Sequence, residues 1–177
     1  MHHPPAASTL ATRRQALLTL AAGATTWLAR PAHAVAVGEA APVLQLPGLN
    51  GPVDLAALQG QVVLLDFWAS WCTPCKLSFP WMNALQARLG PRGLQVVAVN
   101  LDRQRSAADV FLRQTPAQFT VGFDPSGYSP KRFGVKAMPT SLLIGADGRV
   151  LLQHEGFRDS DRPTLEAAVE AALAKRR

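Results

Sequence analysis

The sequence contains only two cysteines and four histidines among 177 residues, and this scarcity limits the chemistry that the chain can carry. The two cysteines, Cys72 and Cys75, are three positions apart. A structural zinc site needs four ligands, commonly from two such pairs, and downstream of residue 34 the one histidine is His154. A disulfide kept for stability alone would close a very short loop and contribute little. The pattern favours a dithiol/disulfide exchange pair over both of these alternatives.

The chain also lacks a hydrophobic run long enough to span a membrane. Its uncharged stretch, residues 16–29, is shorter than the roughly 20 residues that a spanning helix needs. It follows Arg13 and Arg14 and precedes residues 32–34, whose small side chains suit a cleavage site. We therefore expect residues 1–34 to be an export signal that is cleaved, on a twin-arginine or general secretory route, with an uncleaved anchor as the alternative. Residues 35–177 are expected to form one domain in the periplasm.

A basic stripe interleaved with aromatic side chains is absent as well. The net charge is +6, and part of it belongs to the arginines of the expected signal. The sequence therefore gives no reason to expect a nucleic-acid partner. A disulfide framework in an exported protein normally uses more cysteines spread along the chain, so this single pair is expected to carry out chemistry.

Strand-forming and helix-forming segments alternate downstream of the expected signal. The expected strands are residues 43–46, 53–54, 61–68, 94–100, 120–123, 140–144 and 150–153, and the expected helices are residues 55–58 (a single turn), 72–89, 106–114 and 162–174. The first two strands would form a hairpin around Asn50 and Gly51, and Ser106 would cap its helix. This order predicts an α/β fold in which helices flank a central mixed β-sheet, with an N-terminal β-hairpin extension.

The chemistry expected at the cysteines follows from their position in this order. Residues 61–68 form a continuous apolar run, typical of a strand buried on both faces, and it leads directly to Cys72. A helix that begins at Cys72 would favour the thiolate form of that residue. Asp66 lies inside the apolar strand, where an acid is costly to keep without a function, although a capping or surface carboxylate is the alternative.

At this point the chain resembles the thioredoxin superfamily, specifically the exported thiol:disulfide oxidoreductases of the TlpA/ResA-like kind. The resemblance rests on the entry segment 38–42, on residues 66–76 around the cysteines, and on residues 138–140 with the sequence Met-Pro-Thr. It covers nearly all of residues 35–177 and implies a thioredoxin-like fold.

The resemblance implies a role for each matching residue. Cys72 would be the nucleophile, Cys75 would resolve the mixed disulfide, and Asp66 would accept the proton of Cys75, as the buried aspartate of thioredoxin does. Pro139 would be cis and would offer a backbone edge to an extended substrate. The residues expected to contact substrate are Trp71, Met138 and Thr140, whereas Trp68 and Trp81 are expected to be core aromatics.

The chain departs from ResA-like relatives in one respect. They usually carry Asn at the position of Asp66 and an acid shortly after the second cysteine, where this chain has Ser78. We therefore expect proton handling to have moved to Asp66. Thr73 and Pro74, between the cysteines, include no histidine, which resembles reducing members of the superfamily.

These features predict a monomeric reductase of protein disulfides that needs no cofactor or metal. It would receive electrons from a membrane thiol donor and serve cytochrome c maturation or related envelope thiol reduction. Two alternatives stay open. A Sco-like copper chaperone would use both thiolates for Cu(I), although that family spaces its cysteines differently and adds a distal histidine. A peroxiredoxin would want a hydroxyl side chain where this sequence has Ala69.

Overall fold

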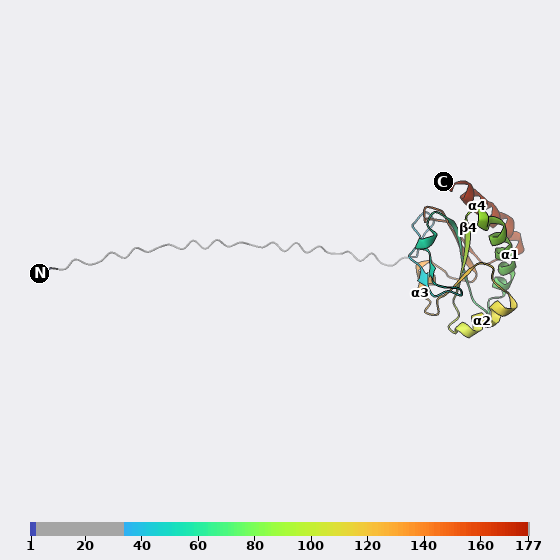
Figure 1. The fold of residues 1–177 in the computed structure, drawn as a ribbon, viewed down its shortest axis with the longest axis horizontal. Helices are drawn as coiled ribbons and strands as arrows, with labels where there is room; N and C mark the ends of the chain where they lie inside the picture. Colours follow the sequence, from blue (N-terminus) through green and yellow to red (C-terminus); the bar gives the residue numbers. More distant parts are fainter. Residues whose placement is uncertain (3–33, 177) are drawn as a thin grey trace. The chain divides into compact units, whose positions relative to one another are not determined.

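The computed structural model of the protein describes residues 1–2 and 34–176 (Figure 1). Nearly all of the expected export signal, residues 1–34, lies outside the described residues, so the signal and its cleavage stay predictions. Residues 34–176 belong to one compact unit. Within the described part of the chain, no helix is long and apolar enough to cross a bilayer.

The core of this unit is a mixed five-stranded sheet with the strand order β5-β4-β3-β6-β7. Its strands are β3 (Val62–Trp68), β4 (Leu94–Asn100), β5 (Thr120–Phe123), β6 (Thr140–Ile144) and β7 (Val150–Glu155). β3, β4 and β5 are parallel to one another, whereas β6 runs antiparallel to both β3 and β7. The sheet confirms the predicted α/β class, and each of these strands lies within two residues of its expected bounds.

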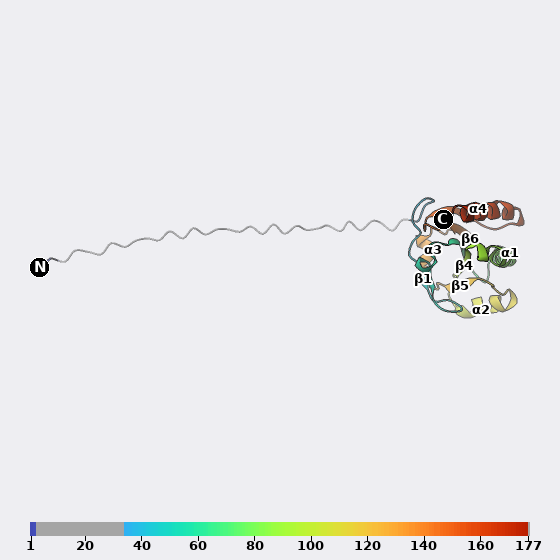
Figure 2. The ribbon, with the colours of Figure 1, turned by 45° about the horizontal axis from the view of Figure 1, so that its top comes forward.

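Helices cover the two faces of the sheet unequally (Figure 2). They are α1 (Thr73–Leu89), α2 (Arg105–Gln114), α3 (Tyr128–Arg132) and α4 (Arg162–Ala174), with single 3-10 turns η1 (Ala56–Leu58), η2 (Gly90–Arg92) and η3 (Asp159–Asp161). Side chains alternate along β3, so Leu64 and Trp68 join the core cluster of α1, α2 and α4, whereas Leu65 and Phe67 join the cluster of Phe133 on the other face. Asp66 therefore points toward the α1 face.

Trp68 is the centre of an aromatic group that holds two helices against the sheet. Its ring lies 4.8 Å from Phe79 of α1 and 4.7 Å from Phe111 of α2, between ring centroids. Trp81 is also buried, packs on Phe157 and donates its Nε1–H to Glu166 of α4. Both tryptophans are core aromatics, as predicted, and aromatic pairs of this kind are worth about 1 kcal/mol beyond their area.

The predicted N-terminal hairpin is present as β1 (Gln45–Leu46) and β2 (Val53–Asp54), which pair antiparallel in a separate two-stranded sheet. The chain between them also pairs with β5, because Leu49 N–H donates to Val121 O and Phe123 N–H donates to Pro47 O, each at 2.9 Å. The extension thereby covers the β5 edge of the main sheet, which would otherwise expose unpaired backbone groups.

Two local predictions differ from the structure. Ser106 is not the cap of α2, which begins at Arg105 with Gln104 as N-cap. The Arg105 side chain bonds Asp109 one turn later and lies over the ring of Phe123, so it favours an earlier start. The helix α3 was not expected, because it is one short turn without apolar periodicity.

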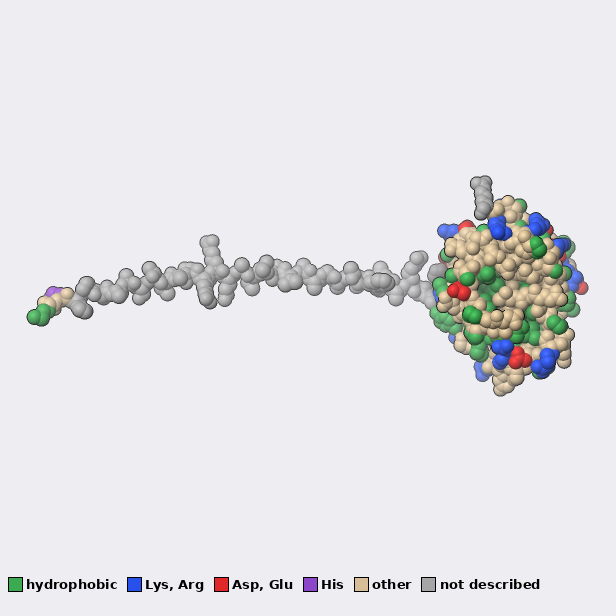
Figure 3. Space-filling view, in the orientation of Figure 1, with side chains coloured by type: hydrophobic (Ala, Val, Ile, Leu, Met, Phe, Trp, Pro, Cys, Tyr) green, Lys and Arg blue, Asp and Glu red, His purple; other side chains and the backbone are tan. Residues whose placement is uncertain are grey.

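On the face seen in Figure 3, charged side chains lie mainly near the edges of the described unit.

Candidate active site

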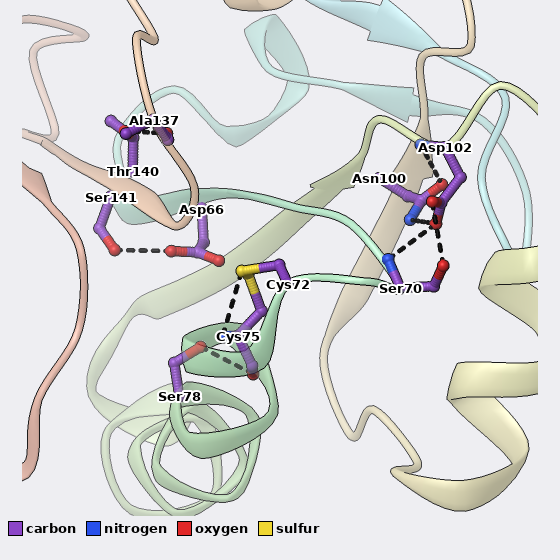
Figure 4. Close-up of a disulfide and its surroundings, with 10 residues drawn as sticks. All are labelled: Asp66, Ser70, Cys72, Cys75, Ser78, Asn100, Asp102, Ala137, Thr140 and Ser141. Carbon is purple, nitrogen blue, oxygen red and sulfur yellow. Dashed lines mark hydrogen bonds between the residues drawn. A yellow bond between two sulfur atoms is a disulfide. The ribbon is translucent and has the colours of Figure 1, made fainter.

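The two cysteines lie where β3 passes into α1, and they are joined by a disulfide with a Cα–Cα distance of 5.3 Å (Figure 4). Cys72 is the N-cap of α1 in an extended conformation, and the backbone N–H of Cys75 donates to its sulfur at 3.3 Å. Cys75 is fully buried one turn inside the helix. Cys72 therefore lies at the positive end of the helix dipole, where a thiolate is stabilised.

A carboxylate just beyond the end of the neighbouring strand β4 holds the loop before Cys72. Asp102 accepts from Ser70 N–H at 2.9 Å, from the Ser70 hydroxyl at 3.0 Å and from Asn100 Nδ2 at 2.8 Å. The backbone N–H of Cys72 donates to Ala69 O at 3.0 Å. The sequence reasoning missed this clamp, although Asn100 ends β4, which runs parallel to β3, and Asp102 follows two residues later. The carboxyl ends of such parallel strands meet at one edge of the sheet.

Asp66 lies behind the disulfide, and its carboxylate oxygens have fewer hydrogen-bond donors than they can accept. Its Oδ1 accepts from the Ser141 hydroxyl at 2.6 Å, and its Oδ2, in the described part of the chain, is buried without a partner. Figure 4 shows the carboxylate between Ser141 and the disulfide, with its free oxygen on the side of the sulfurs. Burial raises the pKa of Asp66 to about 7, against a smaller opposing effect of the Ser141 hydrogen bond.

This environment decides between the alternatives for Asp66. The residue is buried and does not cap a helix, so the surface and capping interpretations are wrong. A carboxyl that titrates near neutrality can both take a proton from a thiol and return it. Ser78, where relatives would have an acid, is buried and donates to Cys75 O at 3.1 Å.

The segment before β6 reaches the same end of the sheet as the cysteines, because β6 is antiparallel to β3 and Thr140 pairs with Phe67. The Met138–Pro139 peptide bond is cis, and Pro139 O accepts from Gly156 N–H at 2.7 Å. Met138 is half-buried. Thr140 is fully buried, and its hydroxyl donates to Ala137 O at 2.7 Å. A substrate contact by the Thr140 side chain is therefore not available, and this side chain closes the Pro139 loop instead.

The remaining predicted residues are placed as follows. Trp71 precedes Cys72 and is 69% exposed, so its ring is free to contact another molecule. Among the residues that the structure describes, no three His, Cys, Asp or Glu side chains cluster as metal ligands, and His154 pairs with Asp161 at 3.3 Å instead. The cysteine pair thus has no third ligand in the described part of the chain for zinc or copper. Ala69 is buried and has no hydroxyl to offer a peroxide.

Comparisons with known proteins agree with this site. The family model described as Redoxin matches residues 36–169. The thiol-disulfide oxidoreductase ResA of Bacillus thuringiensis subsp. konkukian is 34% identical over 127 residues, which cover 71% of this chain and 73% of the relative. ResA of Bacillus subtilis is 32% identical over 120 residues, 67% of each chain.

A solved structure extends the match to the fold. The crystal structure of a candidate thiol:disulfide interchange protein DsbE from Chlorobium tepidum has 55% sequence identity and a TM-score of 0.78, and the match covers 79% of this chain and 99% of that one. The thioredoxin-like fold predicted from residues 66–76 and 138–140 is thereby confirmed. The chain belongs to the redoxin family, and with its paired Cys72 and Cys75 it is a thiol:disulfide oxidoreductase.

Proposed function

We propose that the protein is exported and works as a monomeric reductase of protein disulfides, receiving electrons from a membrane thiol donor. The observation that carries the proposal is the position of Cys72 at the start of α1, with Asp66 behind Cys75. The export part rests on residues 1–34. The names of the similar proteins, thiol-disulfide oxidoreductase ResA and thiol:disulfide interchange protein DsbE, support disulfide exchange as the chemistry. The setting that we propose, cytochrome c maturation or related envelope thiol reduction, rests on the resemblance to TlpA/ResA-like proteins.

In the proposed reaction, the Cys72 thiolate attacks a substrate disulfide and forms a mixed disulfide, which Cys75 then resolves. Cys75 is buried and needs a base, and Asp66 is that base. Pro139 shapes the cis segment that presents backbone to the substrate, and the free backbone groups come from its neighbour Met138, because proline has no N–H and the Pro139 carbonyl accepts from Gly156 N–H. Trp71 and Met138 border the bound peptide, and Thr140 acts only by holding the Pro139 loop.

The reducing direction rests on the two residues between the cysteines. Thr73 and Pro74 occupy the first turn of α1, and neither can place a positive charge beside the thiolate. The thiolate is then less stabilised than in a strong oxidant, so the reduction potential should lie nearer to about −270 mV, as in thioredoxin, than to about −120 mV, as in DsbA.

The first experiment measures insulin reduction by the purified protein and by Cys72→Ala, together with the reduction potential against a thiol buffer. We expect reduction by the wild type alone and a potential on the thioredoxin side. A potential close to that of DsbA, or equal activity in Cys72→Ala, contradicts the proposal.

The second experiment identifies the substrate. A Cys75→Ser variant expressed in the native envelope cannot resolve its mixed disulfide, so the trapped partner stays attached to Cys72. We expect partners that carry paired cysteines, including Cys-X-X-Cys-His segments that attach haem. The variant that also carries Cys72→Ala is the matched control and should trap nothing.

A further inference from the structure

Three polar side chains form a row across the sheet behind the disulfide. Asp66 of β3 pairs with Ser141 of β6, and Ser141 pairs with His154 of β7. Residues directly opposite each other on antiparallel strands point to the same face, with Cβ atoms about 4.5–5.5 Å apart. The row continues to Asp161 at the start of α4, whose Oδ2 lies 3.3 Å from His154 Nε2.

The neighbours of this row show which face of the sheet it occupies. Leu143 and Leu152 lie two residues from Ser141 and His154, pair with each other, and belong to or pack against the core cluster of α1 and α4. Side chains two positions apart on a strand share a face. Ser141 and His154 therefore lie on the face where Asp66 meets the disulfide.

Exposure increases along the row from the catalytic end outward. Asp66 is 1% exposed and Ser141 is 3% exposed, whereas the side chain of His154 is 31% exposed. His154 lies on β7, the edge strand of the sheet. It is therefore the first member of the row that meets water.

The proposed reaction creates a need for such a route, and the present inference rests on that proposed function. When Cys75 attacks the mixed disulfide, a Cys75–Cys72 bond forms, the bond from Cys72 to substrate breaks, and the substrate sulfur leaves as a thiolate. The Cys75 proton passes to Asp66. An Asp66 that is already protonated must first lose its proton, at a stage when the bound substrate covers the sulfurs.

The surroundings of Asp66 leave Ser141 as the connection. On the β4 side the residue opposite Asp66 is Ala98, which carries no exchangeable side-chain proton, and on the α1 side lie the cysteines. The described hydrogen bond to the carboxylate comes from Ser141. A serine hydroxyl can accept a proton from a carboxylic acid on one side while it donates its own on the other.

We propose that His154 is the group through which Asp66 exchanges its proton with water, with the Ser141 hydroxyl between them. The protonated carboxyl donates to Ser141, which donates to the imidazole directly or through one water molecule. The imidazole, which is partly exposed, then passes a proton to solvent. His154 acts through Asp66 and is a positioning and relay residue, not a group that touches substrate.

The charges around His154 suit this role. The titratable group in contact with it is Asp161, which also accepts from Arg158 N–H at 2.8 Å. A carboxylate at this place stabilises the imidazolium that forms in passing. On α4 and η3, Arg162 is paired with Asp159, and the Glu166 carboxylate is held by Arg88 and Trp81. On the strand itself, Glu155 is exposed on the opposite face.

The test follows a single turnover with the complete protein. The reduced protein is mixed with excess disulfide substrate near pH 6.5, in the range where imidazoles titrate, and closure of the Cys72–Cys75 disulfide is followed by tryptophan fluorescence. The wild type is compared with His154→Gln, which cannot carry the proton, and with Glu155→Gln, which removes a neighbouring acid on the other face. Each is measured at increasing imidazole concentration, at constant pH and ionic strength.

We expect His154→Gln to close its disulfide about fivefold more slowly, a smaller effect than the roughly 10²–10⁴ of a direct acid–base group. Added imidazole should restore its rate, while the wild type and Glu155→Gln should not respond. A rate equal to the wild type, or a slow rate that imidazole does not restore, overturns the proposal. If His154→Gln does not fold, His154→Asn replaces it, together with a comparison of Ser141→Thr and Ser141→Ala. Ser141→Thr keeps the hydroxyl and should therefore close its disulfide faster than Ser141→Ala.

A parallel measurement on Asp66→Asn separates this inference from the proposed function. If Asp66→Asn is slow and His154→Gln is not, the relay is wrong and the base assignment stands. If Asp66→Asn closes its disulfide at the wild-type rate, Asp66 is not the base, and the relay is lost together with that assignment.

Discussion

Two of the three buried carboxylates among the described residues, Asp66 in the middle of β3 and Asp124 just after β5, have opposite environments. Asp124 accepts from the Ser129 N–H at 2.7 Å, from the Ser129 hydroxyl at 2.6 Å and from the Ser126 hydroxyl. Its burial would raise the pKa, but these hydrogen bonds outweigh that effect and lower it. Asp66 accepts one such bond, and burial raises its pKa to about 7.

The difference follows from where each acid lies in its element. Asp124 follows a strand, so the next five residues can turn back and donate to it as α3 begins. Asp66 lies within a strand whose backbone donors are committed to the sheet, so its donor has to be a side chain, which here is Ser141 of the neighbouring strand β6. The raised pKa of Asp66 therefore has two causes, its deeper burial within the sheet and its shortage of local donors.

The largest expected effect concerns stability against pH. Between about pH 4 and pH 7 the folded protein binds a proton at Asp66 that the unfolded chain does not bind, so the free energy of unfolding falls as pH rises. The loss is at most about 4 kcal/mol, because each pH unit between the two pKa values is worth about 1.4 kcal/mol. Urea unfolding of oxidised wild type and Asp66→Asn at pH 4 and pH 8 should show the variant gaining relative stability at pH 8. An unchanged difference would mean that Asp66 is not protonated near neutrality.

The next effect concerns the rate of the reaction. Asp66→Asn cannot accept the Cys75 proton, so disulfide closure in a single turnover near neutral pH should slow about a hundredfold, or about 2.7 kcal/mol in the barrier. Asp124→Asn is the matched control and should stay within about twofold of wild type, because Asp124 accepts structural hydrogen bonds only. Equal slowing in both variants would contradict the assignment of Asp66 as the acid that accepts the Cys75 proton.

The third effect concerns the folded state around α3. Asp124→Ala leaves buried donors of Ser129 unpaired, which should lower the free energy of unfolding by about 2 kcal/mol at pH 7. Because the pKa of Asp124 is lowered in the folded state, its carboxylate contributes to the free energy of unfolding at pH values above the ordinary carboxyl pKa. This contribution to stability is lost as the pH falls through the lowered pKa. The gap between wild type and variant in urea unfolding should therefore narrow toward pH 3. A constant gap would point to lost packing rather than to the carboxylate.

The smallest effect concerns one hydroxyl beside each acid. Ser141→Ala removes the described donor of Asp66 and should raise the pKa of Asp66 further, because that hydrogen bond, worth about 1 kcal/mol, favours the charged carboxylate. Ser129→Ala removes one of several donors of Asp124, whose pKa should stay below the ordinary carboxyl value. NMR titration of the carboxyl carbons measures both. A fall in the Asp66 pKa in Ser141→Ala would contradict the account given for that site.

The sequence alone determined those features that depend on neighbours along the chain. The apolar run of β3 identifies a buried strand because burial on both faces leaves no polar alternation. The spacing of Cys72 and Cys75 places them one helical turn apart, and Asp66 is conspicuous as an acid within that apolar run. These patterns were sufficient to predict the α/β fold and the exchange pair. The role of Asp66 as a base came from the resemblance to thioredoxin and stays a prediction.

Only the tertiary structure decided what surrounds those residues. The Asp102 clamp, the closure of the Pro139 loop by Thr140, and the row from Asp66 through Ser141 to His154 all join segments far apart in sequence. Such contacts depend on strand register, because a one-residue slip would turn every side chain of a strand to the other face of the sheet. This register is set by long-range packing. Local sequence patterns do not determine that register. The sequence by itself therefore identifies the buried acid, while the folded sheet determines its donors, its charge and its route to water.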